Sequence, residues 1–190
     1  TLAEREFIGH ARGPQREFLR RIGLWDDEML SWLGHGSSPV HHLESVLGQN
    51  QYLLAHVNDV DDGDLALLER TGQSVVYCPR AAEYFGNERD LGPHRYRDML
   101  QAGIPVALGT DSIINLPRQS ADLERGGIGV LDEMRRLWAR DRTDPGTLLA
   151  MATLHGAAAL GLEIDGFVFK VGARPRGLIA LQVPDEKKDR

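Results

Sequence analysis

The fold is decided by a run at residues 102–112, Ala102-Gly103-Ile104-Pro105-Val106-Ala107-Leu108-Gly109-Thr110-Asp111-Ser112. Gly103 is a stop signal for a helix predicted over His94–Ala102. The next five residues, Ile104–Leu108, form a short and continuously apolar run, which predicts a strand buried on both faces. Because Gly109-Thr110-Asp111 follows at once, this strand delivers a carboxylate at its carboxyl end.

Two earlier segments have the same form. Tyr52–Ala55 is an apolar run of strand length that ends in His56, and Ser74–Cys78 is a second one that Pro79 stops. Between them, Asp61–Glu69 has helical periodicity and an acidic first turn. Apolar strands that alternate with amphipathic helices predict parallel βαβ units, so the fold class is α/β.

The remaining elements are predicted from periodicity and from Gly and Pro. Asp144 and Pro145 are suited to the cap and first position of a helix. The segment Arg80–Pro93, rich in Gly and charge, is predicted to be a long loop. Further elements are two helices within Pro14–Leu33, helical stretches over Val40–Leu47, Val130–Arg140 and Thr153–Leu160, and a last strand at Leu178–Leu181.

Composition excludes several classes of protein. The 190 residues carry a formal charge of −6, with basic and acidic residues intermixed, which argues against a nucleic-acid partner. No apolar run approaches the roughly 20 residues that span a bilayer. The single cysteine, Cys78, has no partner for an internal disulfide, and no signal peptide is recognisable. We therefore expect a cytoplasmic protein that contacts neither membrane nor nucleic acid.

His56 and Asp111 are the residues most able to carry chemistry, because each follows a predicted strand directly. In (β/α)₈ barrels the active site is assembled from the carboxyl ends of different strands. Each residue also has a structural alternative: His56 as a hydrogen-bonded packing residue and Asp111 as the cap of a turn. The pattern alone leaves both interpretations open.

Four segments together resemble successive motifs of the amidohydrolase superfamily, in its cytosine deaminase and chlorohydrolase-like branch. They are Leu54-Ala55-His56-Val57-Asn58, Val75-Val76-Tyr77-Cys78-Pro79-Arg80, residues 102–112, and Met151-Ala152-Thr153-Leu154-His155-Gly156-Ala157. The resemblance implies the C-terminal portion of a (β/α)₈ TIM barrel over residues 1–172. It also implies that residues 173–190 return towards a small β-sandwich.

The resemblance implies a site with one divalent metal ion, zinc by default and iron as the alternative. Asp111 would be a metal ligand that relays a proton from the metal's water to the leaving group. His56 would hydrogen-bond that water or polarise the substrate, and in other branches it is itself a ligand. Substrate contacts are expected from Arg80, Tyr84, Phe85 and His94.

Two motifs of the family are absent from this sequence: the His-x-His pair of strand one and the His-x-Ala-Glu segment of strand five. Residues Thr1–Ile8 resemble the helix that follows His-x-Ala-Glu, so Glu4 is not the catalytic glutamate. We therefore expect the N-terminal half of the same barrel to be a missing partner and the isolated 190-residue chain to be inactive. The family also implies a homodimer.

The predicted function is hydrolytic deamination of an amino-substituted heterocycle of purine, pyrimidine or triazine type. The loop after Pro79 lacks the Ser-Asn of many deaminases, which weakens the case for a cytosine-like or guanine-like substrate. Two alternatives stay open: hydrolysis of a ring C–Cl, C–S or amide bond with the same apparatus, and a chain that is not catalytic. His41 and His42 lack partners at ligand spacing on their own element, so surface or packing roles are expected for them.

Overall fold

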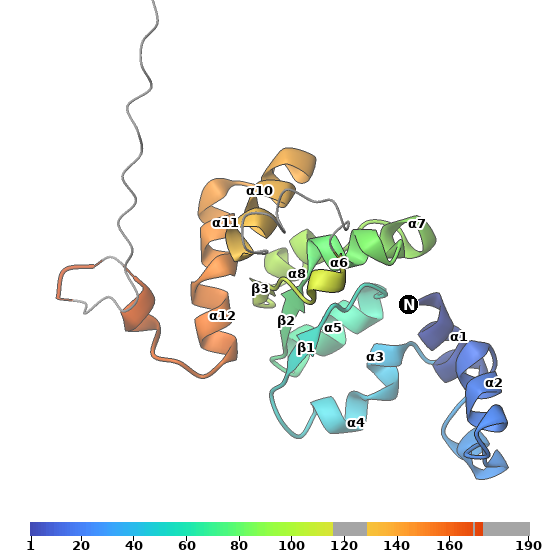
Figure 1. Cartoon of the computed structure of the whole chain (residues 1–190). Helices are drawn as coiled ribbons and strands as arrows, with labels where there is room; N and C mark the ends of the chain where they lie inside the picture. Colours follow the sequence, from blue (N-terminus) through green and yellow to red (C-terminus); the bar gives the residue numbers. More distant parts are fainter. Residues whose placement is uncertain (116–128, 169, 173–190) are drawn as a thin grey trace, which may run out of the picture.

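The centre of the molecule is a parallel sheet with the strand order β1-β2-β3 (Figure 1). The strands are β1 (Leu53–Ala55), β2 (Ser74–Tyr77) and β3 (Val106–Leu108). In the register, Leu54 pairs with Val75, which in turn pairs with Val106. The three apolar runs that predicted strands are thus confirmed, as is the parallel α/β arrangement. The computed structural model describes residues 1–115, 129–168 and 170–172.

Helices join and cover these strands. One α-helix, α5 (Asp62–Arg70), connects β1 to β2. The connection from β2 to β3 holds α6 (Pro79–Tyr84), α7 (Asn87–Leu91) and α8 (Tyr96–Gln101). Before the sheet come α1 (Leu2–His10), α2 (Pro14–Arg21), the 3₁₀ turn η1 (Asp27–Ser31), α3 (Pro39–His42) and α4 (Glu44–Leu47). After it come η2 (Ile113–Asn115), α10 (Val130–Asp141), α11 (Pro145–Ala152), α12 (Leu154–Ala159) and η3 (Ile164–Phe167).

Capping residues explain where two of these helices begin. The carboxylate of Asp61 accepts a hydrogen bond from the Asp64 backbone N–H at 2.8 Å, which starts α5. In the same way, Asp144 accepts from the Thr147 backbone N–H at 2.9 Å, directly before the Pro that opens α11. Both predicted helix starts are confirmed.

The predicted loop over Arg80–Pro93 is wrong, because the segment folds into α6 and α7. Pro79 occupies the first turn of α6, where its missing N–H costs nothing. Ala81 and Ala82 are 1% exposed, since α6 packs against α10, some fifty residues later in the chain. This tertiary contact outweighs the glycine and charge that suggested a loop.

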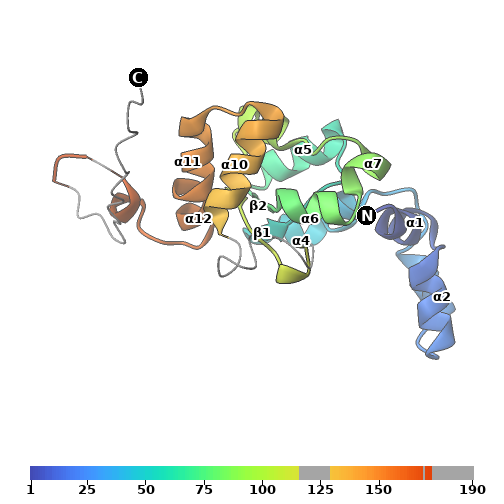
Figure 2. The ribbon, with the colours of Figure 1, turned by 45° about the horizontal axis from the view of Figure 1, so that its top comes forward.

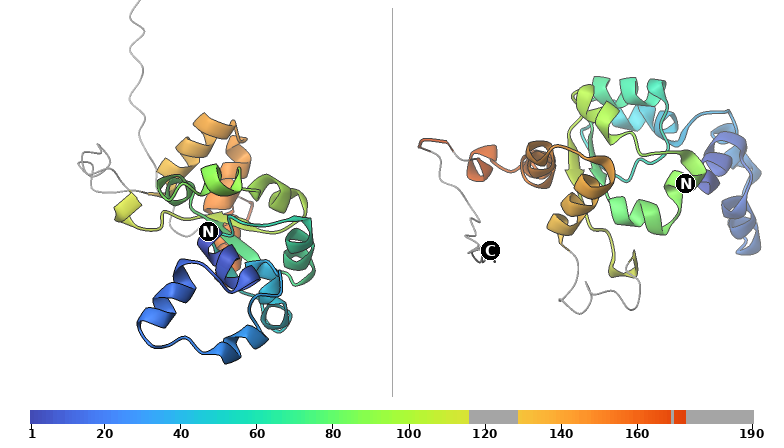
Figure 3. Two further views of the ribbon diagram at one scale, coloured as in Figure 1. Left: turned by 90° about the vertical axis from the view of Figure 1, so that its right-hand side faces the viewer. Right: turned by 90° about the horizontal axis from the view of Figure 1, so that it is seen from above.

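The core lies between the sheet and its helices. Val75, Tyr77 and Val106 are fully buried, and β3 contacts α8, α10, α11 and α12. The helices α1 and α2 lie at one end of the molecule and α11 and α12 at the other (Figures 1, 2 and 3). The sheet therefore lies between two helical regions.

None of the helices in the described part of the chain combines the length and apolar character that crossing a membrane requires. The cytoplasmic location stays a prediction. The predicted strand at Leu178–Leu181, and with it the expected β-sandwich, lies outside the described residues.

Candidate active site

His56 and Asp111 lie at the same edge of the sheet, because each follows the carboxyl end of a strand and the strands are parallel. Both residues have left-handed backbone conformations, with φ of 67° at His56 and 56° at Asp111. Non-glycine residues adopt this region rarely, and such residues concentrate at functional sites. His56 and Asp111 thus follow strand ends at one edge of the sheet in the same backbone conformation, and their joint part in one site stays a prediction.

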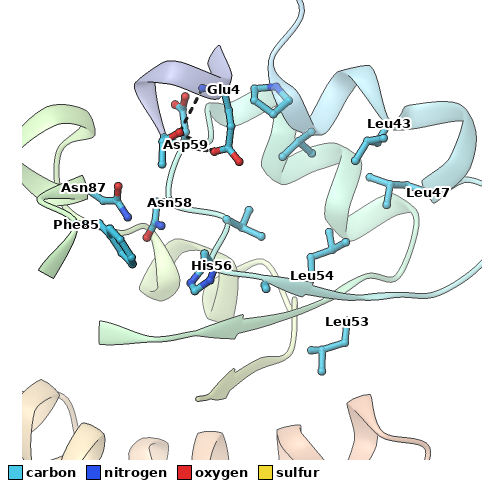
Figure 4. Close-up of a pocket in the computed structure, with 15 residues that line it drawn as sticks. Glu4, Leu43, Leu47, Leu53, Leu54, His56, Asn58, Asp59, Phe85 and Asn87 are labelled. Carbon is cyan, nitrogen blue, oxygen red and sulfur yellow. Dashed lines mark hydrogen bonds and ion pairs between the residues drawn. The ribbon is translucent and has the colours of Figure 1, made fainter. Parts of the chain in front are cut away.

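His56 is half-buried at the end of β1 and lines a cavity of about 530 Å³ (Figure 4). Its backbone N–H donates to the carbonyl of Val76 on β2 at 2.8 Å, which extends the ladder by one bond. Leucine side chains, including Leu43, Leu47 and Leu54, form an apolar part of the cavity wall. The imidazole thus borders a space large enough for a small ligand.

Polar and aromatic side chains form the part of the cavity wall nearest His56. Asn58 follows it in the chain, and Phe85 and Asn87 come from the end of α6 and the start of α7 (Figure 4). Only Phe85 was predicted from the sequence. Asn58 and Asn87 were missed, because an amide carries no local signal until the fold brings it beside the histidine.

The loop after β1 is tied to α1 through Asp59, which also lines the cavity. Asp59 is 9% exposed and forms an ion pair with the guanidinium of Arg5. Glu4 lines the cavity as well, and its carboxylate takes part in the capping box of α1 with Thr1. A capping role agrees with the prediction that Glu4 is not the catalytic glutamate.

Asp111 is exposed, in contrast to His56. Its Oδ2 accepts a hydrogen bond from Nδ2 of Asn115 at 3.2 Å, and Asn115 is itself buried at the end of η2. Burial and the nearby carboxylates of Asp111 and Glu133 raise the pKa of the Cys78 thiol to about 11, so it is protonated and unsuited as a nucleophile.

Arg80, a predicted substrate contact, lies inside the protein with 6% of its surface exposed. Its backbone N–H donates to Glu133 Oε2 at 3.1 Å, and its Nε lies 3.3 Å from Glu133 Oε1. Glu133 on α10 is fully buried, and burial raises the pKa of its carboxyl. The pair fixes the segment after β2 to α10, while the role of Arg80 in substrate binding stays a prediction.

His94, another predicted substrate contact, is 6% exposed. Its Nε2 lies 2.7 Å from the carbonyl oxygen of His56, and its ring stacks on Tyr77 at 3.8 Å between centroids. Burial lowers the pKa of His94 from 6.5 to about 4. The structure thus joins His94 to the backbone of His56, and its predicted contact with substrate is untested.

Tyr84 and Phe85, the last predicted substrate contacts, are both exposed at the end of α6. Their rings meet edge to face, with centroids 5.0 Å apart. Phe85 lines the cavity beside His56, whereas Tyr84 does not. Their roles in substrate binding also remain predictions.

Within residues 1–115, 129–168 and 170–172, one group of three side chains could hold a metal ion: His41, Asp61 and Asp64. Asp64 is already engaged there, since Oδ1 accepts from Ser38 and contacts His41 Nδ1 at 2.7 Å, and Oδ2 accepts from the Asp61 backbone N–H at 3.1 Å. These contacts cap α3 and α5, and the two aspartates that join His41 come from the start of α5, so they were not visible at ligand spacing on the element of His41.

At the strand ends, Asp111 offers an exposed carboxylate and His56 a half-buried imidazole. Oxygen and imidazole nitrogen are suitable donors for zinc or iron. No third histidine, cysteine or carboxylate lies near enough to either residue to complete a group of three within the described ranges. The residues present therefore fit part of a metal site.

The model of the amidohydrolase family matches residues 15–175, which is most of the sequence. The chain belongs to the amidohydrolase family. This membership implies a TIM-barrel type of fold, and the parallel sheet with helical connections is consistent with a part of it.

Curated relatives of this amidohydrolase chain are named deaminases. The 5-methylthioadenosine/S-adenosylhomocysteine deaminase of Haloarcula marismortui is 33% identical over 138 residues, which cover 68% of this chain and 29% of the relative. An isoxanthopterin deaminase from an unknown prokaryotic organism is 29% identical over 155 residues, covering 76% of this chain and 29% of the relative. The chain thus spans less than a third of the length of these relatives.

A solved guanine deaminase from C. acetobutylicum, with guanine bound in its active site, has a lower similarity. It is 18% identical with a TM-score of 0.44, covering 77% of this chain and 32% of that chain. A likeness of this size assigns no role to any residue.

Proposed function

We propose that this chain supplies part of the active site of a metal-dependent hydrolase that removes ammonia from an amino-substituted heterocycle. The observation that carries the proposal is that, in a chain of the amidohydrolase family, His56 and Asp111 follow parallel strands at one edge of the sheet. The deaminase names of the curated relatives support the reaction type.

Asp111 is assigned as a ligand of one divalent metal ion, zinc by default, with iron as the alternative. A bound divalent metal lowers the pKa of a coordinated water towards neutrality. The Asp111 carboxylate accepts a proton from the attacking water and delivers it to the departing amino nitrogen. The ring carbon then exchanges its C–N bond for a C–O bond, and ammonia leaves.

His56 is assigned to hold the attacking water or the substrate ring by a hydrogen bond, because its imidazole borders the cavity. Phe85 and the amides of Asn58 and Asn87 line the same cavity. An aromatic ring with amide donors and acceptors suits a planar heterocycle whose edges carry nitrogen and oxygen. The purine and pterin rings in the names of the relatives have this chemistry.

The remaining metal ligands are proposed to come from other strands of the same barrel. A catalytic zinc site normally uses three protein ligands, whereas Asp111 is the one ligand assigned among the described residues and His56 is assigned to the water or the substrate. On this proposal, residues 1–172 are the C-terminal portion of the barrel, and a chain without the other strands does not turn over substrate. A homodimer and a sandwich over residues 173–190 remain proposals.

Ammonia release by the full-length protein tests the proposed reaction. The protein is supplied in turn with adenosine-type nucleosides, amino-substituted pterins, cytosine and amino-triazines. The amount of ammonia released is compared with the amount of hydroxylated ring formed. Chelation of the metal is expected to abolish release, and added Zn²⁺ or Fe²⁺ to restore it. Release of chloride, thiol or a ring-opened amide in place of ammonia contradicts deamination, and full activity after chelation contradicts the metal.

A further inference from the structure

The chain forms a left-handed elbow directly after β1. His56 and Val57 are consecutive, with φ of 67° and 50°, and neither is glycine. A β-branched residue such as Val57 is particularly disfavoured in this region. Conformations of this kind persist only where the surrounding structure holds them in place.

Three hydrogen bonds hold the elbow. The His56 N–H donates to Val76 on β2 at 2.8 Å, and the Val57 N–H donates to the Ala55 carbonyl at 2.9 Å. The third bond joins the His56 carbonyl oxygen to Nε2 of His94 at 2.7 Å. A carbonyl only accepts, so Nε2 carries the proton and donates. The first two bonds join backbone groups, one across to β2 and one within the elbow, whereas the third comes from a side chain that lies 38 residues further along the chain.

His94 is itself fixed by a buried aromatic network. Its ring stacks on Tyr77 with an interplanar angle of 18°, and Tyr77 is fully buried. The Tyr77 hydroxyl donates to Glu88 Oε1 at 3.2 Å and accepts from Arg140 Nη2 at 3.1 Å. Because the His94 ring is buried and stacks on a tyrosine that is itself held by two hydrogen bonds, the His94 donor has little freedom to follow a moving carbonyl.

We propose that His94 is a positioning residue for His56. Its Nε2–H holds the His56 carbonyl, and this bond fixes the left-handed elbow from which the His56 imidazole reaches the cavity. The inference rests on the proposed function only in giving His56 a part in the reaction. The hydrogen bond itself is testable without turnover.

Two substitutions separate the donor from the ring in the full-length protein. His94→Phe keeps an aromatic ring on Tyr77 and removes the donor, whereas His94→Gln keeps an N–H donor at a similar reach and removes the ring. We expect His94→Phe to lower kcat by about 10²-fold with little change in KM, since a misplacement of about 1 Å has this effect. His94→Gln is expected to recover most of that loss.

Tyr96→Phe is the matched control. Tyr96 is 3% exposed in the same aromatic cluster, and its hydroxyl bonds to Asp141 and Thr143 rather than to the elbow. The change is expected to lower the melting temperature and to leave kcat unchanged. A loss of kcat that follows melting temperature across the three variants would mean that His94 only stabilises the fold, and would overturn the proposal.

The carbonyl ¹³C resonance of His56 gives a readout that does not depend on activity. It is expected to shift in His94→Phe and to stay near its wild-type position in His94→Gln and Tyr96→Phe. An unchanged resonance in His94→Phe overturns the positioning role. If the wild-type protein releases no ammonia from any heterocycle, the proposed function fails, and this resonance alone still decides the role of His94.

Discussion

The ends of β1 and β3 resemble each other in backbone and differ in support. His56 and Asp111 both have a left-handed backbone conformation. His56 directly follows β1, and Asp111 comes shortly after the end of β3. The His56 end is half-buried, and a buried side chain holds its carbonyl. The Asp111 end is exposed, and Asn115 holds its carboxylate. Substitutions of the buried side chains that support His56 should therefore change both the stability of the protein and the placement of His56. A substitution of the exposed Asp111 should act mainly on the reaction.

The largest effect on the free energy of unfolding is expected at the end of β2, which lies between β1 and β3. There Glu133 fixes the segment that follows the strand. Glu133→Ala removes a fully buried carboxylate from its ion pair with Arg80. Breaking such a pair from one side lowers the free energy of unfolding by about 3 kcal/mol. Urea denaturation measures the change, with Asp165→Ala as the control, because Asp165 and Lys170 form an exposed pair. Equal effects of the two variants would contradict the assignment.

Low pH should lower the stability of the protein by protonating His94, which supports the His56 end. Its pKa is about 4 in the folded protein against an ordinary value of 6.5, so the unfolded chain binds the proton first as pH falls. Stability is full above pH 6.5 and declines below it, by about 2 kcal/mol at pH 5. His94→Gln should lose this part of the decline. Parallel stability curves of wild type and variant between pH 7 and 5 would show that His94 does not titrate in this way.

A smaller effect is expected at the Asp111 end from Gly109→Ala. A Cβ at Gly109 would lie 2.7 Å from Val76 Cγ2 and 3.0 Å from Cys78 Sγ, both on or beside β2. The overlap should lower the free energy of unfolding by about 1–2 kcal/mol. Gly156→Ala is the matched control on α12, since its Cβ would make an ordinary 3.9 Å contact with Ala107. Thermal unfolding compares the two, and a neutral Gly109→Ala would mean that β2 and β3 can separate here.

The sequence predicted those parts of the fold that depend on local pattern. Apolar runs predicted the three strands, the acidic first turn of Asp61–Glu69 predicted the start of one helix, and the cap Asp144 predicted that of another, because these signals lie within a few residues. The segment after Pro79 was predicted as a loop because the contact of α6 with α10 joins residues far apart in the chain.

The candidate site divides in the same way. His56 and Asp111 could be predicted, since their position after a strand is visible in the sequence. Arg80 and His94 were selected as substrate contacts, yet their buried partners, Glu133 and the His56 carbonyl, lie 53 and 38 residues away. No local pattern reports such pairings, because they arise only when the strands are assembled.

The central claim is that Asp111 binds the metal and moves the proton in a deaminase. Metal content and ammonia release of the full-length protein, measured together for Asp111→Asn and the exposed control Asp165→Asn, test it most directly. We predict that Asp111→Asn loses metal and lowers kcat by about 10²–10⁴-fold, while Asp165→Asn matches wild type. An Asp111→Asn protein that keeps both its metal and its turnover would contradict the account.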